Sequence, residues 1–226
     1  MNILVHYCLP SFTNCYILGG DRGLSAANGS LNDSIPADTP AAKNNRDAIL
    51  IDPGDMDAEI LEYIESNDYW LRAVLVTHDH HSHVQGLRTL MRIYDVDIYA
   101  VNHVIMDRRA NVVKGGDIIT IGPFRIEVIS VPGHSADSVV YKIDRFLFTG
   151  DALTAGLVGS TASSYGAALQ ISAIRGKLLS LPGDFVILPG HGPPSSLEAE
   201  RRFNTGVQLF DQNKNRRPKF TSDYLL

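Results

Sequence analysis

The chain has 226 residues, of which 44% are hydrophobic and 20% are charged, as in an ordinary soluble globular protein. Its formal net charge of −5 argues against a protein that binds nucleic acid through a basic surface. The two cysteines, Cys8 and Cys15, need no disulfide framework, because a chain of this length can bury a sizeable core without one. We therefore expect a single domain over residues 1–226.

Two uncharged stretches raise the question of a targeting or membrane segment. Residues 1–20 lack the basic start of a signal peptide, and polar residues interrupt residues 152–174 too often for a spanning helix. We therefore expect a cytoplasmic protein with neither nucleic acid nor a membrane as a partner. The sequence leaves the oligomeric state open.

In the first half of the chain, apolar residues that alternate with period two predict strands. These strands are Ile3–Val5, Cys15–Leu18, Ala48–Ile51 and Ala73–Thr77. The spacing of Ile60, Leu61 and Ile64 predicts a helix from Asp57 to Glu65. Residues 21–47 show no periodicity and are rich in Asn, Ser, Ala, Asp and Pro, so we expect a long, mobile surface loop there.

The second half of the chain begins with a predicted helix over Val84–Tyr94. The strands expected after it are Asp97–Val101, Asp117–Ile121, Phe124–Val131, Ser138–Ile143, Phe146–Thr149 and Phe185–Leu188. Two more helices are expected, Ala167–Leu181 and Ser196–Phe210, and the basic segment Lys214–Lys219 is expected to be solvated. Strands thus come in two groups that are each followed by helices, which predicts two packed sheets with helices outside.

Histidine is the residue type that points to chemistry. Four of the eight histidines fall within six residues: His78, His80, His81 and His83. Other polar segments, each with a His or Asp, also follow predicted strands: Asp52–Gly54, Pro132–Ser135, Thr149–Asp151 and Pro189–Gly192. Loops at strand ends present ligands on a rigid scaffold, and neutral imidazoles with carboxylates suit Zn²⁺, Fe²⁺ and Mn²⁺.

We predict two metal sites from these segments. His78 and His80 can point the same way in an extended stretch, and His134 with Asp151 would complete the first site. His83 and His191 would form a second site, with Asp151 bridging the two ions. His6 and His103 are isolated and His81 should point away from its neighbours, so we expect none of these three to bind metal.

These segments resemble the metallo-β-lactamase superfamily, whose signature is His-x-His-x-Asp-His followed by separate His, Asp and His ligands. The segments LFTGDAL (147–153) and LPGHGPP (188–194) are most similar to the small glyoxalase II-like hydrolases. The resemblance implies an αββα sandwich with the metals at the edge of the two sheets. It also implies Zn as the cofactor, as one or two ions, with Fe or Mn as alternatives, and Asp151, His134 and the residue at position 82 as catalytic residues.

Two positions depart from that family pattern. Ser82 occupies the place of the motif Asp, and a neutral hydroxyl is a poor metal ligand and too weak an acid to serve as a base near pH 7. Residues 159–162 read Gly-Ser-Thr-Ala where the relatives carry Gly-Arg-Thr-Asp. We therefore expect the second ion to be bound more weakly than the first.

Three functions follow from this reading. The first is a metal-dependent hydrolase of a small-molecule thioester, such as a glutathione thioester, which would use a metal-activated hydroxide. The second is a persulfide dioxygenase-like enzyme with a single iron, because two His and one carboxylate form the set that activates O₂. The third is a non-catalytic or regulatory protein on a degenerate hydrolase scaffold.

Overall fold

The computed structural model describes residues 1–20 and 46–208, which form two six-stranded sheets flanked by helices. In the first sheet the strand order is β1-β2-β3-β4-β5-β8. These strands are β1 (Asn2–Cys8), β2 (Thr13–Gly19), β3 (Arg46–Ile51), β4 (Tyr69–Leu75), β5 (Asp97–Ala100) and β8 (Asn111–Val112). β1, β2 and β3 are antiparallel in turn, whereas β3, β4, β5 and β8 are parallel.

In the second sheet the strand order is β16-β15-β12-β11-β10-β9. Its strands are β9 (Ile118–Ile121), β10 (Phe124–Ser130), β11 (Val139–Ile143), β12 (Phe146–Gly150), β15 (Val186–Pro189) and β16 (Ser195–Ser196). β12 and β15 are parallel, and their pairing shifts register between Phe148 and Gly150. This bulge re-aims the chain immediately before Asp151.

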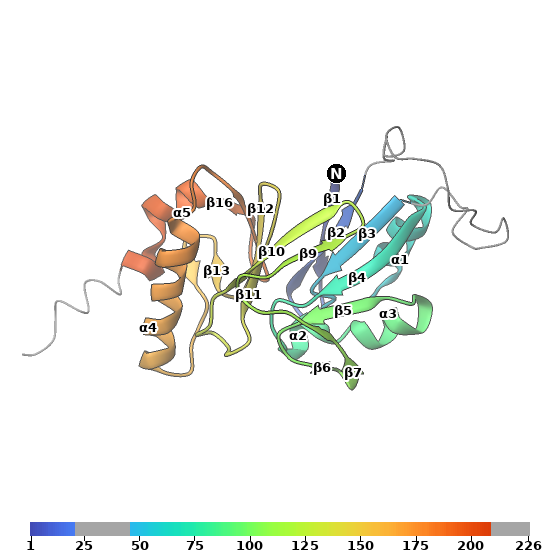
Figure 1. Cartoon of the computed structure of the whole chain (residues 1–226), viewed down its shortest axis with the longest axis horizontal. Coiled ribbons are helices and arrows are strands. Elements are labelled where there is room, and N and C mark those ends of the chain that lie inside the picture. The colour runs from blue at the N-terminus through green and yellow to red at the C-terminus, as the bar shows by residue number, and fades with distance from the viewer. Residues whose placement is uncertain (21–45, 209–226) are drawn as a thin grey trace, which may run out of the picture.

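The helices lie outside the two sheets (Figure 1). They are α1 (Ala58–Ser66), α2 (His81–Val84) and α3 (Leu87–Ile93) on the first sheet, and α4 (Ser164–Ala173), the π-helix η2 (Ile174–Leu179) and α5 (Leu197–Phe203) on the second. The described part of the chain also contains two small hairpins: β6 (Val104–Ile105) with β7 (Arg108–Arg109), and β13 (Leu153–Thr154) with β14 (Leu157–Val158).

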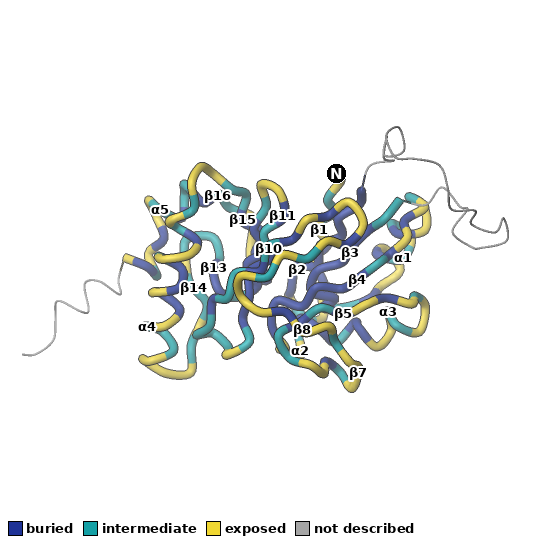
Figure 2. The backbone as a smooth tube through the Cα atoms, viewed as in Figure 1, coloured by how far each residue is buried: buried dark blue, intermediate teal, exposed yellow. Residues whose placement is uncertain are grey.

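Three apolar clusters hold the layers together, and Figure 2 shows the buried strands between them. One lies between the first sheet and its helices, where Leu50 and Leu87 are fully buried. The second lies between the sheets around Tyr141 and Phe148, and the third joins the second sheet to its helices around Leu178. This order of layers confirms the predicted αββα sandwich.

Element boundaries differ from the prediction in several places. The helix expected at Val84–Tyr94 is two helices, α2 and α3, and α2 already begins at His81. The helix expected at Ala167–Leu181 begins at Ser164 and becomes a π-helix at Ile174. Apolar spacing alone does not distinguish a regular helical turn from a wider one, because both return side chains to nearly the same face.

The predicted loop 21–47 is shorter at its carboxyl end, because Arg46 and Asp47 already belong to β3. Its other residues, and the basic segment Lys214–Lys219, lie outside the described residues. In the described part, no helix is long and apolar enough to cross a membrane. Cys8 and Cys15 are both free thiols, so neither is used in a disulfide.

Candidate metal centre

The six predicted metal ligands meet at one edge of the sandwich. β10, β12 and β15 run in the same direction, so the segments that follow them reach one edge of their sheet. The segment that follows β4 in the other sheet meets them there. The side chains form two groups, and within each group the ligand atoms lie within 4.8 Å of one another. The first group comprises His78, His80, His134 and Asp151, and the second comprises His83, Asp151 and His191.

In the first group, three ring nitrogens converge on one point. Nδ1 of His80 lies 3.0 Å from Nε2 of His78 and 3.0 Å from Nε2 of His134. Oδ2 of Asp151 is 3.9 Å from Nε2 of His78 and 3.5 Å from Nε2 of His134. His78 is buried, while His80 lies at the solvent side.

The second group shares Asp151 with the first. Oδ1 of Asp151 is 3.4 Å from Nε2 of His83, and Oδ2 is 3.6 Å from Nε2 of His191. The ring of His83 is fully buried, whereas that of His191 is partly open to solvent. The carboxylate therefore stands between the groups, as a ligand that bridges two ions would.

Each of His134 and His191 has an inner ring nitrogen that faces Asp151 and an outer one that is hydrogen-bonded to an acceptor, and this bond fixes the tautomer. Nδ1 of His134 donates to the carbonyl of Ser160 over 2.7 Å, and Nδ1 of His191 donates to the carbonyl of Phe12 over 2.6 Å. A carbonyl can only accept, so these outer nitrogens carry the proton and the inner Nε2 atoms present lone pairs. Residues 159–162, whose sequence differs from the family pattern, thus still orient His134, because they do so through a backbone carbonyl.

Asp52 orients two further histidines, a role that the sequence analysis did not assign. Its carboxylate accepts from Nδ1 of His83 over 3.0 Å and from the Thr77 hydroxyl over 2.7 Å. Since the Thr77 proton goes to Asp52, the same hydroxyl accepts from Nδ1 of His78 over 3.1 Å. The sequence could have indicated this role, because Asp52 follows a predicted strand, as the candidate ligands do.

The donor set fits a divalent cation. Nε2 of His83 and Oδ1 of Asp151 are buried and have no hydrogen-bond partner among the described residues. In the first group, a single proton on His80 cannot serve two facing lone pairs. An unpartnered buried polar atom is costly, and a cation between these atoms removes that cost.

The pKa values show the same environment. Burial and the neighbouring His83 lower the pKa of His78 to about 3, so its ring stays neutral. Burial would raise the pKa of Asp151, but the facing His83 outweighs burial and lowers it to about 2. Burial would lower the pKa of His83, but the carboxylates of Asp151 and Asp52 raise it to about 10. A cation would take the place of this proton.

Gly190 forms the floor between the two groups. A Cβ atom there would collide with the His83 ring and the Asp151 carboxylate, so only glycine leaves both side chains in place. Gly54 similarly lies against the backbone carbonyl of Ser82. That carbonyl also accepts from the Thr13 hydroxyl over 3.0 Å, which holds α2 against the start of β2.

The remaining histidines lie outside these two groups, and His6 instead forms a third group of possible ligands with Asp57 and Glu59. Ser82 directly precedes His83 on α2. His81 is exposed on the same helix, and His103 is exposed before β6. His6 is buried beside α1, where its Nε2 lies 2.9 Å from Oδ2 of Asp57.

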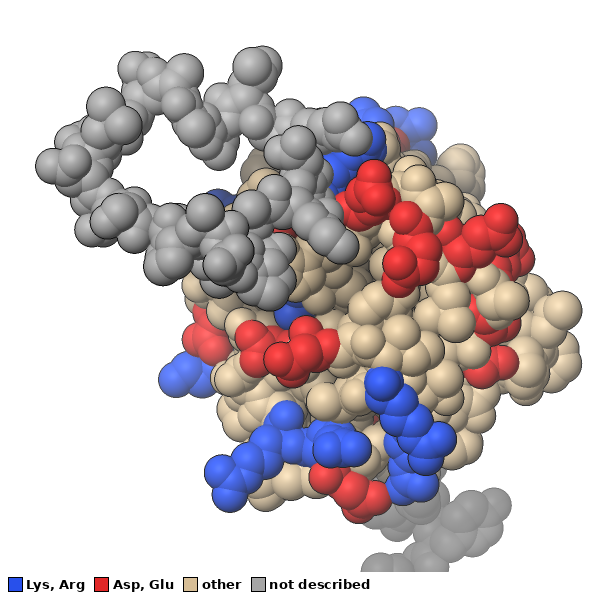
Figure 3. Space-filling view, turned by 90° about the vertical axis from the view of Figure 1, so that its right-hand side faces the viewer, with Lys and Arg blue, Asp and Glu red and all other residues tan. Residues whose placement is uncertain are grey.

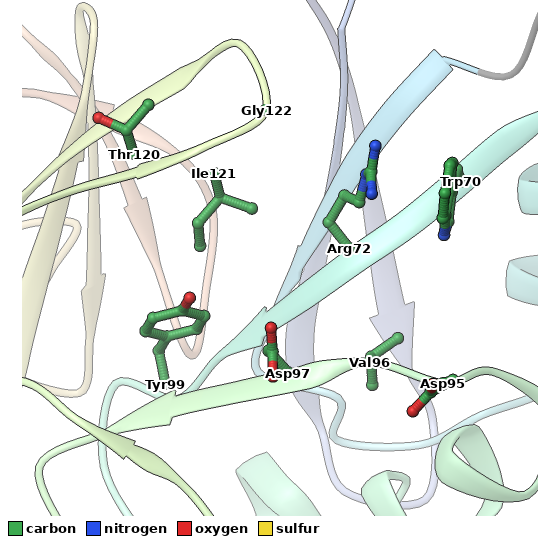
Figure 4. Close-up of a pocket in the computed structure, with 9 residues that line it drawn as sticks. All are labelled: Trp70, Arg72, Asp95, Val96, Asp97, Tyr99, Thr120, Ile121 and Gly122. Carbon is green, nitrogen blue, oxygen red and sulfur yellow. The ribbon is translucent and has the colours of Figure 1, made fainter. Parts of the chain in front are cut away.

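A separate cavity of about 490 Å³ opens between β4, β5 and the β9–β10 turn (Figure 4). It contains none of the candidate ligands. Its basic residue, Arg72, is held by Asp47 over 2.6 Å and lies 3.6 Å from the centre of the Trp70 ring. Charges of both signs also alternate with uncharged surface on the face shown in Figure 3. The metal centre thus remains the candidate functional site.

The family model of the metallo-beta-lactamase superfamily matches residues 42–191, which include all six candidate ligands. The chain belongs to this superfamily. It is 32% identical over 148 residues to a hydroxyacylglutathione hydrolase of Photorhabdus laumondii, covering 65% of this chain and 58% of that protein. It is 29% identical over 187 residues to hydroxyacylglutathione hydrolase GloC of Haemophilus influenzae, covering 71% and 87% of the two chains.

Among solved metallo-beta-lactamase folds, the crystal structure of ETHE1 from Myxococcus xanthus matches with a TM-score of 0.74 and 24% identity. The match covers 97% of this chain and 93% of that one. At this identity the likeness shows the fold alone. The chain spans less than two thirds of the length of the Photorhabdus hydrolase.

Proposed function

We propose that the protein is a divalent-metal-dependent hydrolase of a small-molecule thioester, such as an acylglutathione. The observation that carries this proposal is the inward set of lone pairs around Asp151, with the outer nitrogens of His78, His83, His134 and His191 held by acceptors. Such a set is built to hold cations rather than to exchange protons with one another. The name of the Photorhabdus relative supports the thioester class.

In this proposal each ligand has a defined position. His78, His80, His134 and Asp151 hold the first ion, and His83, His191 and Asp151 hold the second. When bound, the ions acidify water and polarise a carbonyl. Asp151 and Asp52 keep the histidines oriented, and the exposed side of His80 and His191 leaves room for a substrate. Zn is the ion we favour, with Fe or Mn as alternatives.

A thioester suits this site because a thiolate leaves without the help of a strong acid. Ser82, where the family motif has an Asp, cannot act as a base near neutral pH. The residues described around the centre therefore serve to bind and orient, and the reaction needs little further proton transfer from side chains.

A second candidate is the dioxygenase-like enzyme with one iron ion. It is favoured by one observation, the serine at position 82, which leaves the second group with three ligands. Two measurements on protein purified without chelator separate the candidates. The hydrolase should release thiol from S-lactoylglutathione and carry one or two ions. The dioxygenase should carry one iron and consume O₂ with glutathione persulfide, and a regulatory protein should do neither.

The assignment of His80 as a ligand can be tested against its neighbour His81, since the two residues are adjacent at the start of α2. His80→Ala should lose the first ion and most turnover, by about a hundredfold or more, while His81→Ala should keep both. Inductively coupled plasma mass spectrometry measures the ions, and a thiol-detecting assay measures turnover. Equal metal loss in the two variants would contradict the assignment.

A further inference from the structure

Four exposed apolar side chains lie along β1 and the turn that follows it. Val5, Tyr7 and Leu9 are 45%, 48% and 71% exposed, and Phe12 is 64% exposed. Val5 and Tyr7 alternate along β1 and therefore share one face, and Leu9 and Phe12 lie in the turn that follows. We call these four residues the apolar β1 surface. Several exposed apolar residues within one short segment, unlike single exposed apolar residues, are typical of a binding site.

The apolar β1 surface adjoins the metal centre. The Phe12 carbonyl accepts from the metal-candidate His191 over 2.6 Å, and two residues later Asn14 donates to the carbonyl of Gly192 over 2.7 Å. On the other side, Thr13 holds the carbonyl of Ser82. The turn that carries Leu9 and Phe12 is thus attached to two of the three segments that supply the second group of ligands, those of His83 and His191.

The backbone holds the Phe12 ring out to solvent. Phe12 has φ of +56°, a left-handed conformation that is unfavourable for a bulky residue. Such conformations persist where surrounding contacts impose them, and they gather at binding sites. Here the bond from His191 is one such contact. An aromatic ring that gains little burial in the fold is therefore kept exposed on a residue whose carbonyl holds a candidate ligand.

The lack of charged side chains on this surface indicates which part of a substrate it could bind. Residues 1–20 contain no Lys, Arg, Asp or Glu, so this segment offers no charge to bind a carboxylate or an amine. Its exposed apolar side chains are suited to contact hydrocarbon. We propose that the apolar β1 surface binds the acyl chain of the substrate and that the preferred thioesters carry an unsubstituted alkyl acyl group rather than a hydroxyacyl group. The inference rests on the proposed thioester hydrolase.

The test uses acyl thioesters of N-acetylcysteamine with acyl chains of two to eight carbons. Full burial of a methylene corresponds to about a fourfold gain in affinity, so on an open surface kcat/KM should rise about twofold per methylene. Leu9→Asn and Phe12→Asn should flatten this dependence without changing metal content, since asparagine tolerates a positive φ and keeps the Phe12 carbonyl. Ile118→Asn, at an exposed position on β9, is the matched control and should keep it.

A binding measurement gives a readout without turnover. S-Hexylglutathione should bind at least about tenfold more tightly than S-methylglutathione by calorimetry, and Phe12→Asn should remove this difference. A flat chain-length profile in a parent enzyme that hydrolyses thioesters overturns the acyl-chain inference alone. A parent that hydrolyses no thioester overturns the proposed function, and the inference with it. If Phe12→Asn converts a dimer into a monomer in sedimentation velocity, the surface is a subunit contact and the inference is wrong.

Discussion

Each histidine of the metal centre has two ring nitrogens, and the protein uses them differently. The inner nitrogen faces Asp151 or another ring, while the outer nitrogen of four of the histidines is bonded to an acceptor. Two of these acceptors are backbone carbonyls, of Ser160 and Phe12, and the other two depend on Asp52. One buried carboxylate thus controls the orientation of His78 and His83.

This predicts a strong effect of Asp52→Asn on metal binding. The amide keeps the shape and tolerates the positive φ of 51° at this position, but it removes the charge that holds His83. Metal affinity should fall by roughly 10–100-fold, the usual effect of losing a partner of a ligating histidine. Competition with a chromogenic chelator measures it. Asp107→Asn, at an exposed position that also has a positive φ, is the control, and an equal fall in both variants would contradict the role of Asp52.

Restoring the family residue at position 82 tests the second group of ligands. Ser82→Asp adds a carboxylate next to His83, and carboxylate oxygens are good ligands of a divalent ion. The second ion should bind at least about tenfold more tightly, a gain of roughly 1.4 kcal/mol. Metal content measured after dialysis should approach two ions per chain. His81→Asp controls for the added charge, and metal content identical to the parent would show that position 82 does not face the second ion.

At the scale of elements, α5 holds the segment that follows Asp151. The buried Glu200 accepts from the backbone amide of Gly156 over 3.0 Å, from the Ser195 hydroxyl over 2.5 Å and from the Asn204 side chain over 2.6 Å. These bonds join β13–β14, β16 and the end of α5 through one carboxylate. The helix thereby supports the metal edge from outside the sheet.

Glu200→Ala should therefore destabilise the fold without removing a metal ligand. It leaves buried donors without an acceptor, which should lower the free energy of unfolding by about 2–4 kcal/mol. Glu198→Ala on the same helix loses only surface ion pairs with Arg201 and Arg202 and should cost less than about 1 kcal/mol. Urea denaturation compares the two. Similar values for both would mean that the Glu200 bonds do not stabilise the fold.

At the scale of the whole molecule, the metal centre connects the two sheets. Its ligands follow β4 in the first sheet and β10, β12 and β15 in the second. An ion bound there crosslinks both halves of the sandwich. Metal binding and folding should then be linked, since the native state alone brings the ligands together.

Removal of metal should lower the melting temperature. An ion present at about a thousand times its Kd stabilises the native state by about 4 kcal/mol. For a chain of this size, this corresponds to roughly 10 °C. Differential scanning fluorimetry with and without a chelator measures the difference, which should be clearly smaller in His80→Ala, because that variant keeps only the second, weaker ion. A chelator effect of equal size in that variant would indicate binding elsewhere.

The sequence by itself determined the layers and the types of residue at the metal edge. Period-two runs located most long strands of both sheets, because a strand that packs on a core needs an apolar side chain at every second position. The ligands were visible because each His or Asp follows a strand, where the chain leaves the sheet. The predicted helix over 167–181 was less accurate, since its apolar spacing did not reveal the turn to a π-helix at Ile174.

Only the tertiary structure decided what holds those ligands in place. His191 donates to the carbonyl of Phe12, 179 positions away, and His134 donates to the carbonyl of Ser160. Every residue has a carbonyl, so no residue type marks these partners in the sequence. The exposure of Phe12 was equally hidden, because an apolar side chain in a strand-rich segment is expected to be buried. The bond that its carbonyl accepts from His191 depends on how β1, β2 and the segment after β15 pack together.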